Sequence, residues 1–218
     1  MKRQWPVMLA MLVMAFHAPL GLWAQGDDPR FPEIGPWLID HTGLAAHWLG
    51  EKLGGRSLRE PINVIIRDPW SKTREEAVGK LLAECASRGY EEEVGHSGGY
   101  WADMEGILYP QIPDNRRRAL ANKEFFFANN HGRVMGPVYW GSAWVFAAAF
   151  SREAFHPLTK TRHVFVSFTI ARNDFCRRLD GGGLYRIVGS LDLGNALDDA
   201  QTTTADHDGK ATILEASR

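Results

Sequence analysis

Cysteine is scarce in this chain, which holds Cys85 and Cys176 and no other among its 218 residues. At most one disulfide bridge is possible, and a chain of this length can bury a substantial core without such staples. A bridge and a pair of buried thiols both remain open, because the sequence does not give the Cα separation that a bridge requires. A catalytic thiol would need a nearby base to form a thiolate, and we do not predict one.

Positive charge is not in excess either. The chain has 25 Lys and Arg against 26 Asp and Glu, and loss of a leader that carries Lys2 and Arg3 leaves 23 against 26, a formal charge of −3. A main partner with many phosphates would require an excess of cations. We therefore predict that nucleic acid is not the partner, and we expect the run 116–118 of three arginines to be solvated surface.

Several signatures of common enzyme and binding folds are absent. The sequence has no Gly-x-Ser-x-Gly elbow and no phosphate-binding Gly-x-x-x-x-Gly-Lys-[Ser/Thr] loop. The glycines at 181–183 follow a predicted helix, where a C-terminal cap explains them. The segment 206–209 resembles the start of a calcium loop, but its twelfth position is Ser217 rather than the required Glu. We interpret 206–209 as a tight turn between strands.

The long apolar run of the sequence is at its N-terminus. No charged side chain occurs from Trp5 to Trp23, two cations precede this run, and Ala24 stands before a polar stretch. This is the pattern of a secretory signal peptide over residues 1–24, and it predicts a periplasmic or secreted protein after cleavage near Ala24. The alternative is an uncleaved membrane anchor. Because Pro6 and Pro19 interrupt the run, we favour cleavage.

Residues 25–60 are predicted to precede the main domain. The segment 25–36 is rich in proline and glycine and indicates an extended lead-in. Trp37 to Leu53 is rich in Leu, Ala and Trp and closes on two glycines, which predicts a short amphipathic helix that could also serve as a docking arm.

The main domain is predicted to span residues 61–218. Residues 61–66 have the length and composition of a strand, and Thr73 with Glu76 forms a capping-box pattern for a helix that ends at Gly89. Residues 98–118 show no sustained period and are expected to be mostly loop. Strands are predicted at 125–133, 138–150, 164–170, 184–193 and 211–214, with a second helix at 171–180. This order predicts an α+β fold, a mainly antiparallel sheet with two or three helices packed on it.

Candidate site residues gather in two stretches. In a strand, His131 and Arg133 point to the same face, so a proton donor and a fixed cation would lie side by side, as suits a phosphate or a carboxylate. The alternative is that His131 and Arg133 are ordinary side chains on a polar face of the sheet and bind no ligand. His163, Arg172 and Asp174 form the second stretch and could join His131 if the two strands are neighbours. We take His131, His163 and Asp174 as catalytic candidates, and Arg133 and Arg172 as ligand-binding candidates.

A metal site is weighed separately, because His131, His163 and Asp174 have the chemistry of zinc ligands. Their long separations match no compact motif such as His-Glu-x-x-His. We therefore predict neither a metal nor a cofactor.

Several short motifs follow one another in a recognisable order. They are Pro61-Ile62-Asn63-Val64 before a helix that ends near Gly89-Tyr90, Asn130-His131-Gly132-Arg133, Trp144 with Ala149-Phe150-Ser151-Arg152, His163, and Ala171-Arg172-Asn173-Asp174-Phe175. From about Pro61 to its end, the chain thereby resembles the LssY-like C-terminal domain family. Members often form the extracytoplasmic tail of membrane proteins with a lipid-phosphatase-like region, and they are labelled as type I secretion system components. The resemblance implies no defined reaction.

Three functions follow as hypotheses. The first is an exported accessory or binding module for an anionic envelope ligand, such as an anionic lipid, held by His131, Arg133 and Arg172. The second is a phosphoester hydrolase with His131 or His163 as acid/base and Asp174 orienting the imidazole. The third is a structural partner of a membrane protein in an envelope or secretion complex. The hydrolase requires the histidines and the aspartate to lie within hydrogen-bond reach around a pocket.

Overall fold

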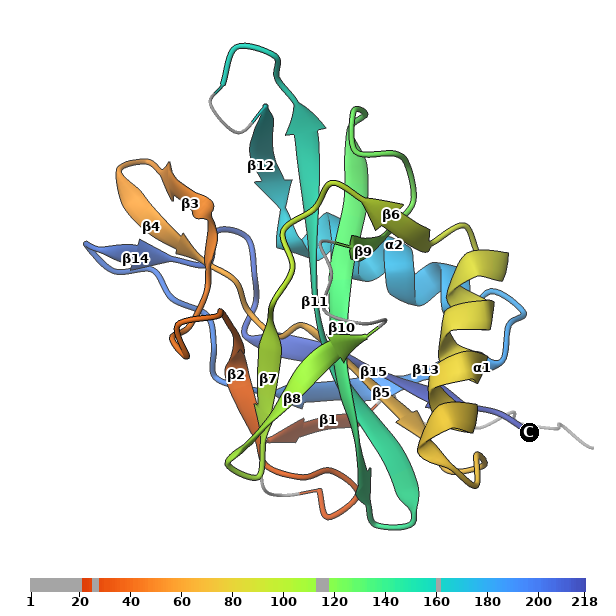
Figure 1. Cartoon of the computed structure of the whole chain (residues 1–218). Coiled ribbons are helices and arrows are strands. Elements are labelled where there is room, and N and C mark those ends of the chain that lie inside the picture. Colours follow the sequence, from red (N-terminus) through yellow and green to blue (C-terminus); the bar gives the residue numbers. More distant parts are fainter. Residues whose placement is uncertain (1–20, 25–27, 113–117, 160–161) are drawn as a thin grey trace, which may run out of the picture.

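The computed structural model describes residues 21–24, 28–112, 118–159 and 162–218 (Figure 1). Most of the predicted signal peptide, residues 1–20, lies outside the described residues. Its last four residues, Gly21–Ala24, form strand β1, which pairs in parallel with β13 (Tyr185–Asp192). Two residues of the arginine run, 116 and 117, also lie outside. Over the described ranges, no helix combines the length and the apolar character needed to cross a membrane.

A large, mainly antiparallel sheet forms the body of the molecule. Its strands lie in the order β1, β13, β15, β5, β11, β10, β8, β7, β2; β12 also pairs with β11, and β9 joins β10 to β6. Their bounds are β2 Ile34–Ile39, β5 Val64–Asp68, β6 Glu91–Val94, β7 Trp101–Met104, β8 Ile107–Ile112, β9 Arg118–Ala121, β10 Asn129–Trp140, β11 Ala143–Phe155, β12 His163–Ser167 and β15 Lys210–Ala216. A small sheet adds β3 (His47–Leu53), β4 (Arg56–Arg59) and β14 (Thr202–Thr203). With two helices in the described ranges, the predicted α+β class is confirmed.

The long hairpin β10–β11 runs through the centre of the sheet (Figure 1). Its turn is Gly141-Ser142, and both residues have positive φ. The single strand expected at 138–150 is therefore wrong, because the turn divides it. Trp140 pairs with Ala143, so the even-numbered apolar residues before and after the turn face opposite sides of the sheet.

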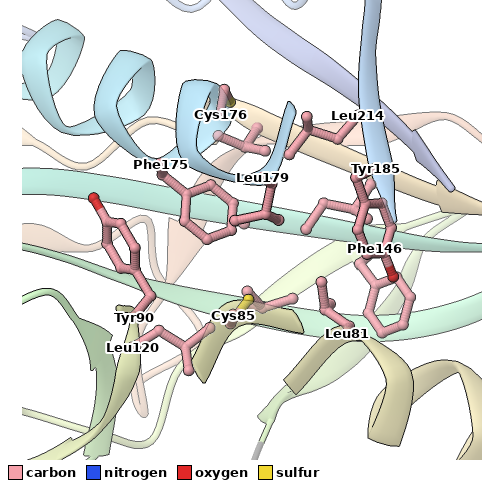
Figure 2. Close-up of a cluster of buried hydrophobic side chains, with 14 of the residues drawn as sticks. Leu81, Cys85, Tyr90, Leu120, Phe146, Phe175, Cys176, Leu179, Tyr185 and Leu214 are labelled. Atoms are coloured by element: carbon pink, nitrogen blue, oxygen red, sulfur yellow. The ribbon is translucent and has the colours of Figure 1, made fainter. Parts of the chain in front are cut away.

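One face of the sheet carries both helices. Helix α1 (Arg74–Ser87) begins as predicted, with the Thr73 side chain accepting a hydrogen bond from the Glu76 amide. Helix α2 is Phe168–Asp180, so it starts earlier than expected and takes in residues predicted as strand. Both helices pack on an apolar core that includes Phe146 of β11, with Leu81 of α1 and Phe175 of α2 (Figure 2). Phe150 of β11 belongs to the same core.

Both cysteines lie in this helix-side core. Cys85 of α1 and Cys176 of α2 are buried, and neither is in a disulfide (Figure 2). Burial raises the pKa of both thiols. They therefore pack as small apolar side chains.

The opposite face carries a second apolar core, and the N-terminal segment forms part of it. Leu38 of β2 is fully buried there, packed with residues of β5, β7, β11 and β15. The helix expected at Trp37–Leu53 is wrong, because this segment forms β2 and β3, and Trp48 is buried in a small cluster beside them. The loop expected at 98–118 is also largely wrong, because β7 and β8 pair as a hairpin within it. Besides these local pairings, β2 pairs with β7 and β8 with β10, strands far away in the sequence, and a local period does not report such pairing.

Candidate functional site

A pocket of about 440 Å³ opens on the face of β10 and β11 that is turned away from the helices. Apolar side chains form part of its wall, among them Trp48, Leu49 and Phe125. Its ionisable lining residues come from separate segments of the chain: Glu60, His96, His131, Arg133, Glu153 and His163. Three of the five residues expected from the sequence, His131, Arg133 and His163, thus share one pocket.

Glu153 of β11 is the centre of this group. Its Oε1 lies 3.0 Å from Nδ1 of His163, 3.8 Å from Nδ1 of His131 and 3.9 Å from Nδ1 of His96. The Nδ2 group of Asn129 donates a hydrogen bond of 3.0 Å to the same oxygen. These four ionisable side chains are nearly inaccessible, with exposed fractions of 1–4%.

The His131 ring is held from both sides. Its Nδ1 lies 3.1 Å from Oδ1 of Asn129, and its Nε2 lies 3.3 Å from Oγ of Ser151. The indole Nε1 of Trp48 donates to the same Ser151 oxygen at 3.1 Å. The His96 ring stacks on His131 with centroids 4.5 Å apart. The two imidazoles therefore have defined orientations toward Glu153.

Burial sets the charge of the group. It raises the pKa of Glu153 to about 7, although the Asn129 hydrogen bond and Arg133 oppose the rise. Burial also lowers the pKa of His131, with further lowering by His96 and Arg133, and it lowers the pKa of His96 to about 3. The pKa of His163 is lowered by burial as well. Neutral imidazoles therefore surround a carboxyl group that can exchange a proton near neutral pH.

Arg133 forms a second, fixed part of the pocket wall. Its Nε and Nη2 donate to the carbonyl oxygen and the hydroxyl of Ser97 at 3.2 and 2.9 Å, and its guanidinium lies over the Tyr100 ring. Nη1 is 3.5 Å from Oε2 of Glu60, a carboxyl group whose pKa burial raises despite Arg133. The cation is thus held in place at the pocket by its own contacts.

Asp174 lies on the other face of the sheet. Its Oδ2 accepts hydrogen bonds from Tyr90 Oη at 2.9 Å, Asn130 Nδ2 at 2.9 Å and Arg178 Nε at 3.0 Å. It does not line the pocket, so the expected role of Asp174 in orienting an imidazole is wrong. Asn130 and His131 are neighbours in β10 and point to opposite faces, which separates Asp174 from the histidines. Glu153, rather than Asp174, lies beside the histidines.

Arg172 also lies outside the pocket. Its Nη1 and Nη2 bind the Asp208 carboxylate at 2.6 and 3.1 Å, which fixes the turn at 206–209 against α2. Within that turn, Asp206 accepts from the backbone amide of Phe168 at 2.9 Å. The acidic turn is therefore accounted for as a cap on the α2 N-terminus. Arg172 is not placed to bind a ligand beside Arg133.

Sequence reasoning missed His96 and Glu153. His96 lies between β6 and β7 in a segment for which no element was predicted, and no pattern ties it to His131. Glu153 had a usable signal. It is two and four residues beyond Ser151 and Ala149, so it continues the inward face of a strand, where an unpaired carboxylate is costly and marks a polar site.

Potential metal ligands converge in this pocket. Donor atoms of His96, His131 and Glu153 all lie within 4.8 Å of one another. This set differs from the zinc ligands weighed from the sequence, because His96 and Glu153 replace His163 and Asp174. Comparison of the chain with protein-family models, curated proteins and solved structures finds no match.

Proposed function

We propose that the pocket is the active site of a hydrolase that acts on a small anionic ester, with phosphoesters as the first class to test. One observation carries the proposal: His131 and His163, from separate strands, both lie against the buried carboxyl group of Glu153 in an open pocket. His163 is within hydrogen-bond reach of Glu153, at 3.0 Å, so Glu153 can take the orienting role first given to Asp174, whereas His131 lies farther away, at 3.8 Å.

The burial of these groups supports a functional role. Transfer of ionisable side chains from water into an interior is unfavourable unless they gain partners, and an apolar side chain would pack there at lower cost. Buried groups with shifted pKa values that gather in a cleft are typical of catalytic sites. The cluster around Glu153 has both properties.

The chemistry divides among the pocket residues. The His163 imidazole, oriented by Glu153, takes a proton from an attacking water and returns it to the leaving alcohol, so that the ester bond breaks without net change in charge on the protein. Arg133 is the fixed cation available to an anionic substituent of the substrate. The apolar wall formed by Trp48 and Phe125 accommodates the less polar part.

The test is an assay of the purified protein with p-nitrophenyl esters: phosphate, phosphodiester, acetate and sulfate. Replacement of His163 by Asn should lower kcat/KM at least about 100-fold, as loss of an acid/base group does. The matched control is His156→Asn, because His156 is exposed and outside the pocket, and it should retain full activity. Equal rates for wild type and His163→Asn would refute the assignment.

A binding module without turnover is the second candidate, and the fixed Arg133 favours it. Isothermal titration of the protein with glycerol phosphate and with short-chain phosphatidylglycerol tests this directly. Heat that disappears in Arg133→Gln, together with no hydrolysis of any ester, would favour binding alone. No heat with either ligand would count against both candidates.

The cellular setting is a proposal that rests on the sequence. The leader pattern supports export and cleavage near Ala24, which N-terminal sequencing of the protein from a periplasmic or culture fraction would test. The relationship to the LssY-like family rests on the short motifs alone. A structural role in an envelope complex has some support in the exposed Leu44, Leu49 and Leu53, in the segment expected to dock.

A further inference from the structure

We propose that His96, His131 and Glu153 together bind one divalent metal ion of the zinc class, with a remaining coordination position open to the pocket. The inference adds a cofactor to the site of the proposed function, but metal binding can be measured without any turnover. It rests on the positions, burial and chemistry of these three side chains.

The spacing of the donor atoms fits such an ion after a small adjustment. Zinc binds imidazole nitrogen and carboxylate oxygen at about 2.0–2.2 Å in a tetrahedron, which sets neighbouring donors about 3.3 Å apart. The Nδ1 atoms of His131 and His96 lie 3.8 and 3.9 Å from Oε1 of Glu153. All three donor atoms lie within 4.8 Å of one another, so side-chain shifts on the order of 1 Å would bring them to bonding distance from one ion.

The hydrogen bonds of the two imidazole rings are also compatible with metal binding. His96 is nine-tenths or more buried, yet its Nε2 has no hydrogen-bond partner among the described residues. For His131, Nε2 lies 3.3 Å from Ser151 Oγ and Nδ1 lies 3.1 Å from Asn129 Oδ1. Binding of an ion by Nδ1 therefore requires the tautomer in which Nε2 donates a hydrogen bond to Ser151, and the ion replaces the contact with Asn129. Outer contacts of this kind orient histidine ligands in metal sites, and Asn129 does the same for the carboxylate through its bond to Oε1.

The donor set selects the class of cation. Two imidazoles and one carboxylate suit zinc and neighbouring transition metals, whereas calcium and magnesium prefer sites made of oxygen alone. His163 lies 3.0 Å from Glu153 Oε1 and outside the three-ligand set. It remains available to exchange protons beside the ion.

A bound cation would also offset the negative charge of the carboxyl groups in the pocket. With neutral imidazoles, the lining residues carry two carboxyl groups, Glu60 and Glu153, against one guanidinium, Arg133. When both carboxyl groups are ionised, the net negative charge of the pocket opposes the binding of an anion beside Arg133. A bound divalent ion would reverse the balance and make the pocket complementary to the anionic ester proposed above.

The test is zinc binding by the purified full chain. The protein is stripped with a chelator, and zinc is then titrated in competition with a chromophoric chelator. We expect one equivalent to bind, with an affinity at least about 100-fold weaker in Glu153→Gln and in His96→Ala, since loss of even an outer contact costs 10–100-fold. The matched control Glu60→Gln changes a buried carboxyl of the same pocket and should bind zinc within a few-fold of wild type.

Two further measurements distinguish loss of zinc binding from loss of folding. Circular dichroism identifies variants that are unfolded. Cobalt substitution should give the intense visible absorption of a four- or five-coordinate ion in wild type and in Glu60→Gln, but not in Glu153→Gln. The inference is overturned if wild type binds no zinc, or if folded Glu153→Gln binds it as tightly as wild type does.

The outcomes for the two proposals are distinguishable. Zinc binding that requires Glu153, without hydrolysis of any ester, would support the metal site and remove the hydrolase. Hydrolysis that requires His163, in a wild-type protein that binds no zinc, would support the hydrolase and remove the metal site.

Discussion

The two faces of the β10–β11 hairpin carry polar clusters at the same end, but the clusters are built differently. On the helix side, one oxygen of Asp174 accepts hydrogen bonds from Tyr90, Asn130 and Arg178. On the pocket side, Glu153 faces three imidazoles, two of them at 3.8 and 3.9 Å, beyond hydrogen-bond distance.

The difference separates a structural network from a site. Around Asp174 the charges are balanced and the donors are used, which is how buried polar groups stabilise a fold. Around Glu153 the groups are drier and less completely paired, so they add little stability and remain available to a ligand. The predictions below test this division, from the largest expected effect to the smallest.

The largest effect is expected at Gly132, between the two clusters in β10. A Cβ atom there would lie 2.2 Å from Cδ1 of Phe150, far inside van der Waals contact. We expect Gly132→Ala to destabilise the protein by about 3 kcal/mol, at the upper end for overpacking. Urea unfolding measures this. The control is Gly79→Ala in α1, which meets no neighbour within 4 Å and should raise stability by up to about 1 kcal/mol.

Substitution of the two acidic residues should give opposite results. Asp174→Ala leaves several donors without an acceptor and should cost about 2–3 kcal/mol of unfolding free energy, with zinc affinity unchanged. Glu153→Gln removes a carboxyl group that burial disfavours, and should change stability by less than about 1 kcal/mol while zinc binding is lost. If Glu153→Gln is the more destabilised of the two in metal-free buffer, the division between network and site is wrong.

The acid stability of the protein should depend on Asp174. Burial alone would raise its pKa, but hydrogen bonds from Asn130 and Tyr90 and the charge of Arg178 outweigh it, so the pKa is lowered from 3.8. A lowered carboxyl pKa stabilises the fold above the unfolded value, and this contribution disappears as pH falls through the folded value. Between pH 7 and about 3, wild type should therefore lose more unfolding free energy than Asp174→Asn does. Parallel curves would contradict the prediction.

The smallest effects are expected at two neighbours in β11. Ser151 contacts His131 and Trp48 on the pocket side, whereas Arg152 donates to Asn130 on the helix side. Each change to Ala should cost about 1 kcal/mol of stability. Only Ser151→Ala should also weaken zinc binding, by about 10-fold, because it removes an outer contact of a ligand. Equal zinc affinities in the two variants would show that Ser151 does not orient His131.

Local signals predicted part of the fold well. Thr73 and Glu76 mark the start of α1: the Thr73 side chain accepts from the Glu76 amide, and the Glu76 side chain accepts from the Lys72 amide rather than from that of Thr73. Features that depend on distant pairing were not predictable in the same way. The alternation over 138–150 continued unbroken through Gly141-Ser142, although the chain reverses there, because a period of two does not report direction.

The candidate site shows the same limit. His131 and Arg133 were found as polar residues in a predicted strand and His163 as a residue just before another, and all three line the pocket. His96 and Glu153 complete it from segments 35 and 22 residues away from His131, a juxtaposition that only the tertiary fold creates. Asp174 was chosen for its chemistry, but it lies across the sheet from the pocket. Asn130, which contacts it, and His131 are adjacent in β10 and therefore point to opposite faces.

The central hairpin has a consequence for how binding would be detected. A ligand bound by His131 and Glu153 stabilises the native state over any form in which β10 and β11 have separated, by RT ln(1 + [L]/Kd). The amides of His131 and Ser151 lie opposite each other in this strand pair. Their hydrogen exchange should slow by a factor of 1 + [L]/Kd, so backbone amides of the central hairpin would report occupancy of the pocket.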